Sequence, residues 1–132
     1  MTTVDQNSAA IKSIYAAFAS GDIPGVLGAM NLDFRWTEPE GNPYAGTYVG
    51  PDAVLHGVFM KLGADWDGFA VVPSEYVAQA DTVVTLGEMS GTNKATGKSF
   101  KTPFVHVWKF GTDRLQSFDA LMDTLVYQRA LQ

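Results

Sequence analysis

The chain has 132 residues and a net charge of −5 at pH 7. Hydrophobic residues make up 46% of it, which is enough for a buried core, so a disordered chain is excluded. The nine Lys and Arg residues are scattered and form no basic patch, which argues against nucleic acid or a membrane surface as a partner. This length fits one domain, and we expect that domain to span residues 1–132.

The chain contains no cysteine, so disulfides, thiolate nucleophiles and cysteine metal sites are excluded. Its two histidines, His56 and His106, lack the spacing of a metal-ligand pair, and we expect neither a metal nor a cofactor. The N-terminus lacks the features of a signal peptide, and no stretch approaches the ~18 apolar residues of a membrane span. We therefore expect a cytoplasmic protein.

The N-terminal segment is predicted to form two helices. Thr3 and Gln6 have the spacing of a capping box, and the apolar residues that follow repeat at helical intervals. Gly21 is the expected end of this helix. A short second helix is predicted to begin at Asp22, with Pro24 in its first turn.

One strand and a third helix follow. Residues 33–38 alternate between apolar and polar side chains, which predicts a strand, and the Pro and Gly residues of 39–43 predict a loop. The third helix is predicted to begin at Gly50-Pro51-Asp52 and to end at Gly63.

The second half of the chain is predicted to form an antiparallel meander, because short turn-like segments separate its apolar runs. We place the strands at 67–78, 82–92, 99–110 and 114–122, and a final helical segment at 123–131. Separate runs of helices and strands predict an α+β fold. Gly87 and Gly91 are the expected bending points of the second of these strands, so that the sheet can curve around the helices and leave a hollow.

Several short motifs are distinctive in combination. They are Phe34 to Gly41, Pro43 to Gly46, Tyr48 to Gly50, Phe104 to Phe110 and Met122 to Thr124. With the order of elements, they resemble the SnoaL-like (polyketide-cyclase-like) branch of the nuclear transport factor 2-like superfamily. This resemblance covers about residues 8 to 131.

The resemblance implies a cone-shaped, strongly curved antiparallel sheet packed on N-terminal helices, which is the cystatin-like α+β barrel. It also implies a pocket in the mouth of the cone and a homodimer formed through the outer sheet face. Enzymes of the superfamily include cyclases, ketosteroid isomerases, limonene-epoxide hydrolases and dehydratases, whereas other members only bind ligands or dimerise. Fold alone therefore does not give function.

His106 is the first candidate for acid–base chemistry, which requires a titratable group in an apolar pocket. It lies in the middle of a predicted strand and shares a strand face with Phe104 and Trp108. It can act as a base, an acid or a hydrogen-bond donor to a ligand. The alternative is a core histidine that a backbone carbonyl or a carboxylate satisfies.

Glu38 is the first acidic candidate. It ends the predicted 33–38 strand on the same face as Trp36, which places its carboxylate at the pocket mouth, within reach of a pairing with His106. The alternative is a solvated loop residue, since Glu is mostly exposed in proteins. The apolar pattern of its strand does not decide whether Glu88 faces the pocket or the solvent.

Asp119 is the second acidic candidate, although strand alternation turns it to the opposite face unless a bulge intervenes. Asp123 matches a recurrent Asp of the resemblance, and we expect it to cap the last helix, with a role in the site as the alternative. The hydrolase-type branch has an acid–base Asp where this chain has Ala120, so the resemblance does not carry hydrolase chemistry over directly.

A mostly apolar pocket with few polar groups is the usual small-molecule site. The residues that we expect to line it are Tyr15, Trp36, Tyr44, Tyr48, Phe59, Phe104, Trp108 and Met122. Three functions remain open. The first is an isomerase, cyclase or hydrolase that acts without a cofactor on a small apolar, oxygenated substrate. The others are a non-catalytic binding protein with the same pocket and a structural dimer module whose pocket is filled.

Overall fold

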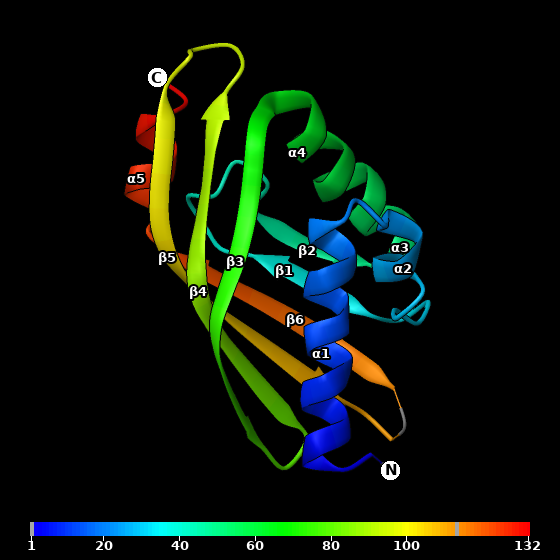
Figure 1. Ribbon diagram of the computed structural model, residues 1–132. Helices are drawn as coiled ribbons and strands as arrows, with labels where there is room; N and C mark the ends of the chain where they lie inside the picture. The colour runs from blue at the N-terminus through cyan, green and yellow to red at the C-terminus, as the bar shows by residue number, and fades with distance from the viewer. Residues whose placement is uncertain (1, 113) are drawn as a thin grey trace.

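The computed structural model describes residues 2–112 and 114–132. The first helix, α1, spans Val4–Ala19 and begins with the predicted capping box, in which both the Thr3 and the Gln6 hydrogen bonds are formed. Its buried residues include Ile11 and Tyr15, and the helix lies against β3 and β4 of the sheet (Figure 1). The second helix, α2 (Ile23–Leu27), is capped by the side chain of Asp22, as predicted.

The third helical segment contains a π-helical turn that the sequence did not predict. It consists of α3 (Pro51–Val54), the π-helical turn η1 (Leu55–Phe59) and α4 (Met60–Asp65). The prediction that it ends at Gly63 is wrong by two residues. Such turns are frequent at functional sites, and this one presents Phe59 to the interior.

The first half of the chain contributes two strands instead of the one predicted. β1 (Arg35–Glu38) pairs with β2 (Gly46–Val49) as an antiparallel hairpin, and β1 also runs parallel to β6 (Leu115–Met122). β2 is only four residues long and lies at the edge of the sheet, where a short strand needs few apolar positions. Its weak pattern explains why it was missed.

The four-strand meander is confirmed. It consists of β3 (Trp66–Gln79), β4 (Thr82–Asn93), β5 (Ser99–Phe110) and β6, each antiparallel to the next. The order across the sheet is β2-β1-β6-β5-β4-β3.

The irregularities that accompany the bend lie in β3, whereas the sequence pointed to β4. The register shifts are between Asp67 and Ala70 and between Pro73 and Glu75. Gly87 of β4 pairs with Pro73 at the second shift. The close approach of β3 at this point therefore depends on the missing side chain of Gly87.

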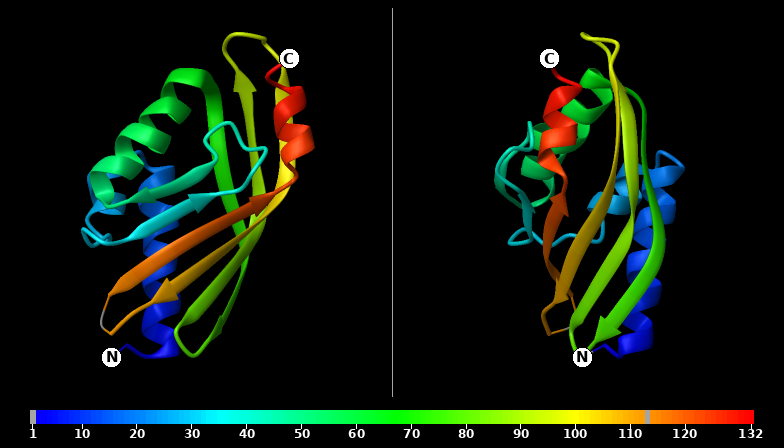
Figure 2. Two further views of the ribbon diagram at one scale, coloured as in Figure 1. Left: turned by 180° about the vertical axis from the view of Figure 1, so that it is seen from behind. Right: turned by 90° about the vertical axis from the view of Figure 1, so that its left-hand side faces the viewer.

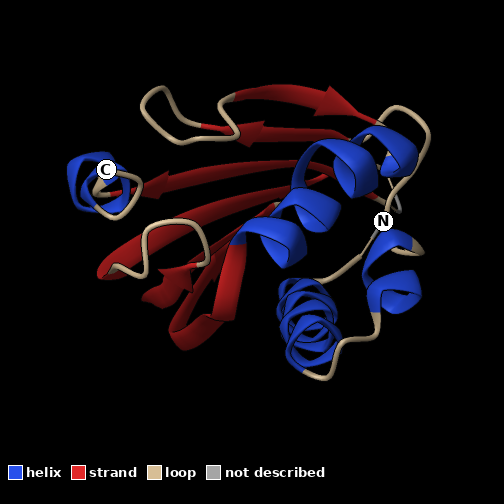
Figure 3. Cartoon of the chain, turned by 90° about the horizontal axis from the view of Figure 1, so that it is seen from above, coloured by secondary structure: helices blue, strands red, loops and turns tan. Residues whose placement is uncertain are grey.

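The sheet curves around the helices without closing into a barrel, and its concave face holds the core (Figures 2 and 3). α1 packs on β3 and β4, and the last helix, α5 (Thr124–Arg129), packs on β5. This arrangement is the predicted α+β fold. None of the helices in the described part of the chain is both long and apolar enough to cross a membrane.

Candidate functional site

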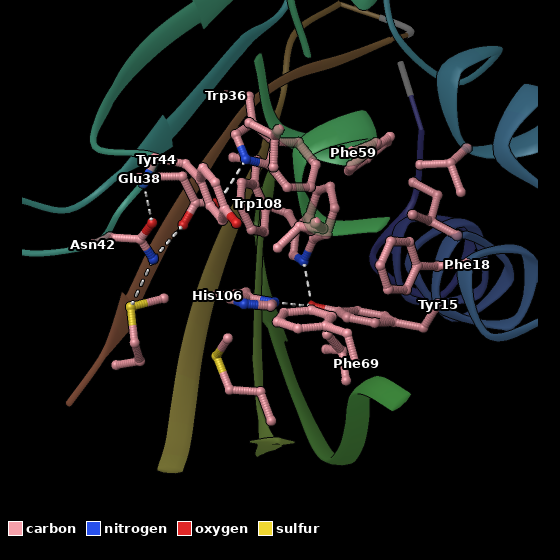
Figure 4. Close-up of a pocket in the computed structure, with 18 of the residues that line it drawn as sticks. Tyr15, Phe18, Trp36, Glu38, Asn42, Tyr44, Phe59, Phe69, His106 and Trp108 are labelled. Carbon is pink, nitrogen blue, oxygen red and sulfur yellow. Dashed lines mark hydrogen bonds between the residues drawn. The ribbon is translucent and has the colours of Figure 1, made fainter. Parts of the chain in front are cut away.

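A cavity lies between the concave face of the sheet, α1 and the α3–α4 segment (Figure 4). Its volume is about 60 Å³, and about 600 Å³ of empty space lies between its walls when the open mouth is included. The walls are mainly aromatic and aliphatic. They are formed by Ile14, Tyr15, Phe18, Val26, Trp36, Glu38, Asn42, Tyr44, Val58, Phe59, Leu62, Phe69, Val71, Met89, His106, Trp108, Phe118, Met122 and Tyr127.

His106 lies in the wall of this cavity and is buried. Strand alternation in β5 turns it inward with Trp108, and its ring stacks on Phe104 at a centroid distance of 4.0 Å. Its Nδ1 is 2.6 Å from the Tyr15 hydroxyl oxygen, which also accepts a hydrogen bond of 3.0 Å from Trp108 Nε1. Burial lowers the pKa of His106 to about 3, so the ring is neutral at pH 7.

Glu38 is the second titratable group in the cavity wall, and it is also buried. Its Oε2 accepts a hydrogen bond of 2.7 Å from Trp36 Nε1, and its Oε1 accepts one of 3.3 Å from Asn42 Nδ2. Burial raises the pKa of Glu38 to about 7, and the hydrogen bond from Trp36 opposes this shift without cancelling it. The carboxyl group therefore exchanges its proton near neutral pH.

Glu38 and His106 do not form the direct pair that the sequence suggested. Each bonds to another side chain, Glu38 to Trp36 and Asn42, and His106 to Tyr15 (Figure 4). Both nevertheless face the same cavity. Both groups can therefore act on a molecule in the cavity without bonding to each other.

A hydrogen-bonded cluster holds the β1–β2 loop against the cavity. Asn42 accepts a hydrogen bond from the Tyr44 backbone N–H, which orients its amide toward Glu38. The Tyr44 hydroxyl donates to Asp65 and accepts from Trp66 Nε1, at 2.7 and 2.9 Å. Burial is the first cause that raises the pKa of Tyr44, so its hydroxyl remains protonated. These contacts fix one side of the cavity.

Most of the predicted site residues lie in the cavity wall, and three do not. The predicted residues in the wall are Tyr15, Trp36, Glu38, Tyr44, Phe59, His106, Trp108 and Met122. Tyr48 lies outside it, because its ring packs beside Gly57 and its hydroxyl donates to the Tyr44 carbonyl. Phe104 is buried behind the ring of His106.

Asp119 is also outside the cavity, which corrects its assignment as an acid–base candidate. It is exposed on the outer face of β6, paired with Val107 and Thr37, and no bulge lies between it and Met122. Its neighbour Ala120 faces inward, opposite His106. Strand alternation alone therefore turns the carboxylate away.

The other polar candidates, Glu88, His56 and Asp123, lie outside the cavity wall. Glu88 points outward and forms an ion pair of 3.4 Å with Lys101, and His56 is exposed. Asp123 caps α5, since its Oδ1 accepts from the Leu125 and Val126 backbone N–H groups. No group of three or more His, Cys, Asp or Glu side chains placed to hold a metal ion occurs in the described part of the chain.

Several residues of the wall were not predicted from the sequence. Phe118 stacks on Trp36 at 3.8 Å, and its alternation with Ala120 and Met122 on β6 was a signal that could have found it. Asn42, which bonds to Glu38, lies in a loop and gave no such signal.

Comparisons with known proteins agree with this architecture. The SnoaL-like domain family matches residues 11–117. An NTF2-like protein from Burkholderia thailandensis is 35% identical, with a TM-score of 0.92 over 100% of this chain and 99% of that one. An NTF2-like protein of unknown function from Burkholderia pseudomallei is 31% identical, with a TM-score of 0.87 over 96% and 97% of the two chains.

A third similar structure contains a ligand. It is TerC co-crystallised with polyporic acid, which is 26% identical, with a TM-score of 0.84 over 95% of this chain and 97% of that one. No match was found among curated proteins. The match to the family, over residues 11–117, includes the strand pair that carries Glu38 and the strand that carries His106. The chain therefore belongs to the SnoaL-like domain family.

Proposed function

We propose that the cavity binds a small, apolar, oxygenated organic molecule. In this proposal Glu38 moves a proton on the molecule, and His106 forms a hydrogen bond to the molecule. The observation that supports this proposal is the presence of a buried carboxyl group and a buried imidazole in one largely apolar wall. Perturbed groups of this kind are enriched at active sites. The proposed reaction class is isomerisation or cyclisation by acid–base catalysis, without a cofactor.

Glu38 has the properties of a general acid–base group. Its pKa of about 7 allows both protonation states at neutral pH, which is the condition for efficient proton transfer in both directions. As a carboxylate, it takes a proton from a carbon next to a carbonyl group, and the C–H electron pair forms a C=C bond while the carbonyl pair moves to oxygen. The resulting carboxylic acid then returns the proton to another carbon of the same molecule.

The size of the cavity limits the ligand. A volume of about 60 Å³ holds a few water molecules, whereas a benzene-sized ligand needs roughly 150 Å³. The ligand must therefore extend into the open mouth or displace a flexible side chain such as Met89 or Met122, which lie in the wall. TerC, which is similar in structure, was co-crystallised with polyporic acid, and this supports the binding of a small organic molecule by the fold.

The proton transfer can be tested without knowing the natural substrate. The probe is 2-tetralone in D₂O, a neutral ring ketone whose C–H groups next to the carbonyl exchange measurably by NMR. We expect the wild-type protein to accelerate this exchange and Glu38→Gln to reduce the acceleration by roughly 10²–10⁴-fold. Glu88→Gln, on the outer face, is the matched control that retains it.

Two results would overturn the assignment. One is acceleration that survives Glu38→Gln. The other is a wild-type protein that neither accelerates the exchange nor shows a thermal shift with 2-tetralone or polyporic acid.

A second candidate function is ligand binding without catalysis. Ala120 favours it, because this position faces inward beside His106 and holds no carboxylate. A binding protein predicts a thermal shift with 2-tetralone or polyporic acid and no acceleration of deuterium exchange. Comparing the two readouts on one protein sample separates the two functions.

We further propose a homodimer formed through the outer sheet face, as the family resemblance implies. This face has an apolar patch, which we define as Val77, Val84, Leu86, Val105, Val107 and Leu121. Val77 is 52% exposed and Leu121 is 54% exposed, although the strands around them are long and well paired. A contiguous exposed apolar patch of this kind is a common mark of a protein interface.

A further inference from the structure

We propose that Tyr15 is a positioning residue that holds His106 in its Nε2–H tautomer, so that His106 donates a hydrogen bond into the cavity to the carbonyl oxygen of a neutral ring ketone. This inference rests on the proposed function for the identity of the site. The tautomer itself follows from the hydrogen bonds of the free protein.

The first step concerns the hydroxyl proton of Tyr15. Trp108 Nε1–H can only donate, so the hydrogen bond of 3.0 Å between Trp108 and Tyr15 uses a lone pair of the Tyr15 oxygen. The Tyr15 hydroxyl keeps its proton, because burial raises its pKa. That proton must still find an acceptor, since an unpaired buried donor is costly.

His106 Nδ1 is the acceptor that the geometry offers. It lies 2.6 Å from the Tyr15 oxygen, at hydrogen-bonding distance. Thr85 is the other candidate, because it pairs with His106 across the two strands and its hydroxyl lies close enough to Tyr15 to lower the pKa of that hydroxyl. Its hydroxyl makes no hydrogen bond of normal geometry in the described part of the chain, whereas the contact between Tyr15 and His106 has that geometry. Tyr15 therefore donates to His106 Nδ1, and this nitrogen cannot hold a proton of its own.

The neutral ring then has its single proton on Nε2. In the described residues, the Thr85 hydroxyl is the sole fully buried side-chain oxygen or nitrogen without a partner. Nε2 of His106 also makes no hydrogen bond there, but it is not among the fully buried atoms without a partner. Nε2 is therefore accessible from the cavity that His106 lines. Figure 4 shows the ring between the Tyr15 hydroxyl and the space below Glu38.

The surroundings of Nε2 define the chemistry of the ligand. Phe104 and Phe118 contact the His106 ring, and no Lys or Arg is present in the cavity wall. A negatively charged ligand group would meet no compensating cation there, and Glu38 would repel it. A neutral carbonyl oxygen accepts one hydrogen bond from Nε2–H without requiring a charge, and the aromatic wall suits a flat ring attached to it.

The tautomer can be measured by ¹⁵N NMR of the free protein. We expect the wild-type His106 signals of a protonated Nε2 and an unprotonated, hydrogen-bonded Nδ1. Tyr15→Phe removes the donor, so the Nδ1 signal shifts toward that of an unbonded nitrogen. Tyr48→Phe, which also removes one hydrogen-bonded hydroxyl, is the matched control and leaves both His106 signals unchanged.

A second variant tests the step through Thr85 and does not depend on the folding of Tyr15→Phe. Thr85→Val removes the partnerless hydroxyl and leaves the wild-type tautomer unchanged if Tyr15 donates to His106. A proton on Nδ1 in the wild type, identical His106 signals in Tyr15→Phe, or a changed tautomer in Thr85→Val would each overturn the inference.

A matched pair of probes tests the ligand chemistry. 1-Indanone and indane have the same ring skeleton and differ in one carbonyl oxygen, so we expect 1-indanone to bind about tenfold more tightly through the Nε2–H donor. His106→Phe, which keeps an aromatic ring but no donor, abolishes that preference. Equal binding of both probes to the wild type overturns the inference and leaves the proposed cavity intact. If neither probe binds, that result contradicts the proposed function. The NMR signals still decide the tautomer in that case.

Discussion

Burial shifts the pKa values of His106 and Glu38, which both line the cavity, in opposite directions. The neutral form is favoured in both, which lowers the pKa of His106 to about 3 and raises the pKa of Glu38 to about 7. At neutral pH only Glu38 is close to its titration point. Among the residues of the wall, the carboxyl group is therefore the one suited to exchange protons, and the imidazole is suited to hydrogen bonding.

The Glu38 shift predicts a pH dependence of stability. The folded state binds the Glu38 proton more tightly than the unfolded chain, whose carboxyl pKa is near 4.5, so stability from this group is lost as the pH rises from 4.5 through about 7. Glu38→Gln removes the loss. The difference in the free energy of unfolding, variant minus wild type, should grow by about 2 kcal/mol between pH 5 and pH 8 in urea denaturation.

Glu88→Gln is the control for this measurement, because that side chain is exposed on the outer face. Its difference from the wild type should stay nearly constant over the same pH range. A Glu38→Gln difference that is equally flat would show that the carboxyl group is not buried in solution.

Thr85 gives a second prediction at the scale of one residue. Its hydroxyl is fully buried and makes no hydrogen bond of normal geometry in the described part of the chain, although it lies near the Tyr15 hydroxyl. Burying such a group costs about 1–3 kcal/mol. Valine has nearly the same shape and lacks the hydroxyl, so Thr85→Val should raise the free energy of unfolding by about 1 kcal/mol. A loss of stability in thermal or urea denaturation would mean that the hydroxyl has a hydrogen-bond partner in solution.

Strand periodicity predicts which face a residue occupies but not its depth. It correctly predicted that His106 and Trp108 face inward, and it indicated that Asp119 faces outward. It could not distinguish Phe104, which lies behind the His106 ring, from a residue that borders the cavity. That distinction depends on packing between β5 and residues that are distant in the sequence.

At the scale of elements, length determined which parts the sequence could predict. The 16-residue helix α1 and the long strands β3 to β5 repeat their apolar positions often enough to be recognised. β2 has four residues and depends on pairing with β1. The π-helical turn η1 was not predicted, because the apolar residues around it also fit the spacing of an ordinary α-helix.

The contact between β3 and β4 predicts the effect of a single methyl group. A Cβ atom on Gly87 would lie 2.3 Å from the Val72 carbonyl oxygen and 2.7 Å from Phe104 Cζ, so either the backbone or the ring must move. Gly87→Ala should therefore lower the free energy of unfolding by about 1–3 kcal/mol. The measurement is urea denaturation.

Gly63→Ala is the matched control. Gly63 lies in α4 and has no heavy atom within 4 Å of an added Cβ, so alanine should be neutral or stabilise the helix by up to about 1 kcal/mol. A Gly87→Ala protein as stable as Gly63→Ala would contradict the tight strand approach seen in the structure.

At the scale of the whole molecule, the cavity arises where five separate segments meet. Tyr15 comes from α1, Glu38 from β1, Asn42 from a loop, Phe59 from the π-helical turn and His106 from β5. The sequence patterns of these segments predicted their buried faces, except for the loop that carries Asn42. The space left between these faces depends on how far the sheet curves, and only the structure gives that curvature.

The outer sheet face provides the last prediction. We expect the wild-type protein to sediment with twice the chain mass of 14.3 kDa, because a dimer would bury the apolar patch around Val77 and Leu121. Leu121→Lys places a charge in that patch, where its desolvation opposes association, and should give a folded monomer. The control is Leu32→Lys. Leu32 is 88% exposed in the loop before β1, so this variant makes the same chemical change away from the outer face and should remain dimeric.

Two results would exclude this face as the interface. One is a wild-type monomer at about 100 µM, and the other is a dimer that survives Leu121→Lys combined with Val77→Lys. Two buried charges in so small an apolar patch cost more free energy than the burial of the patch contributes.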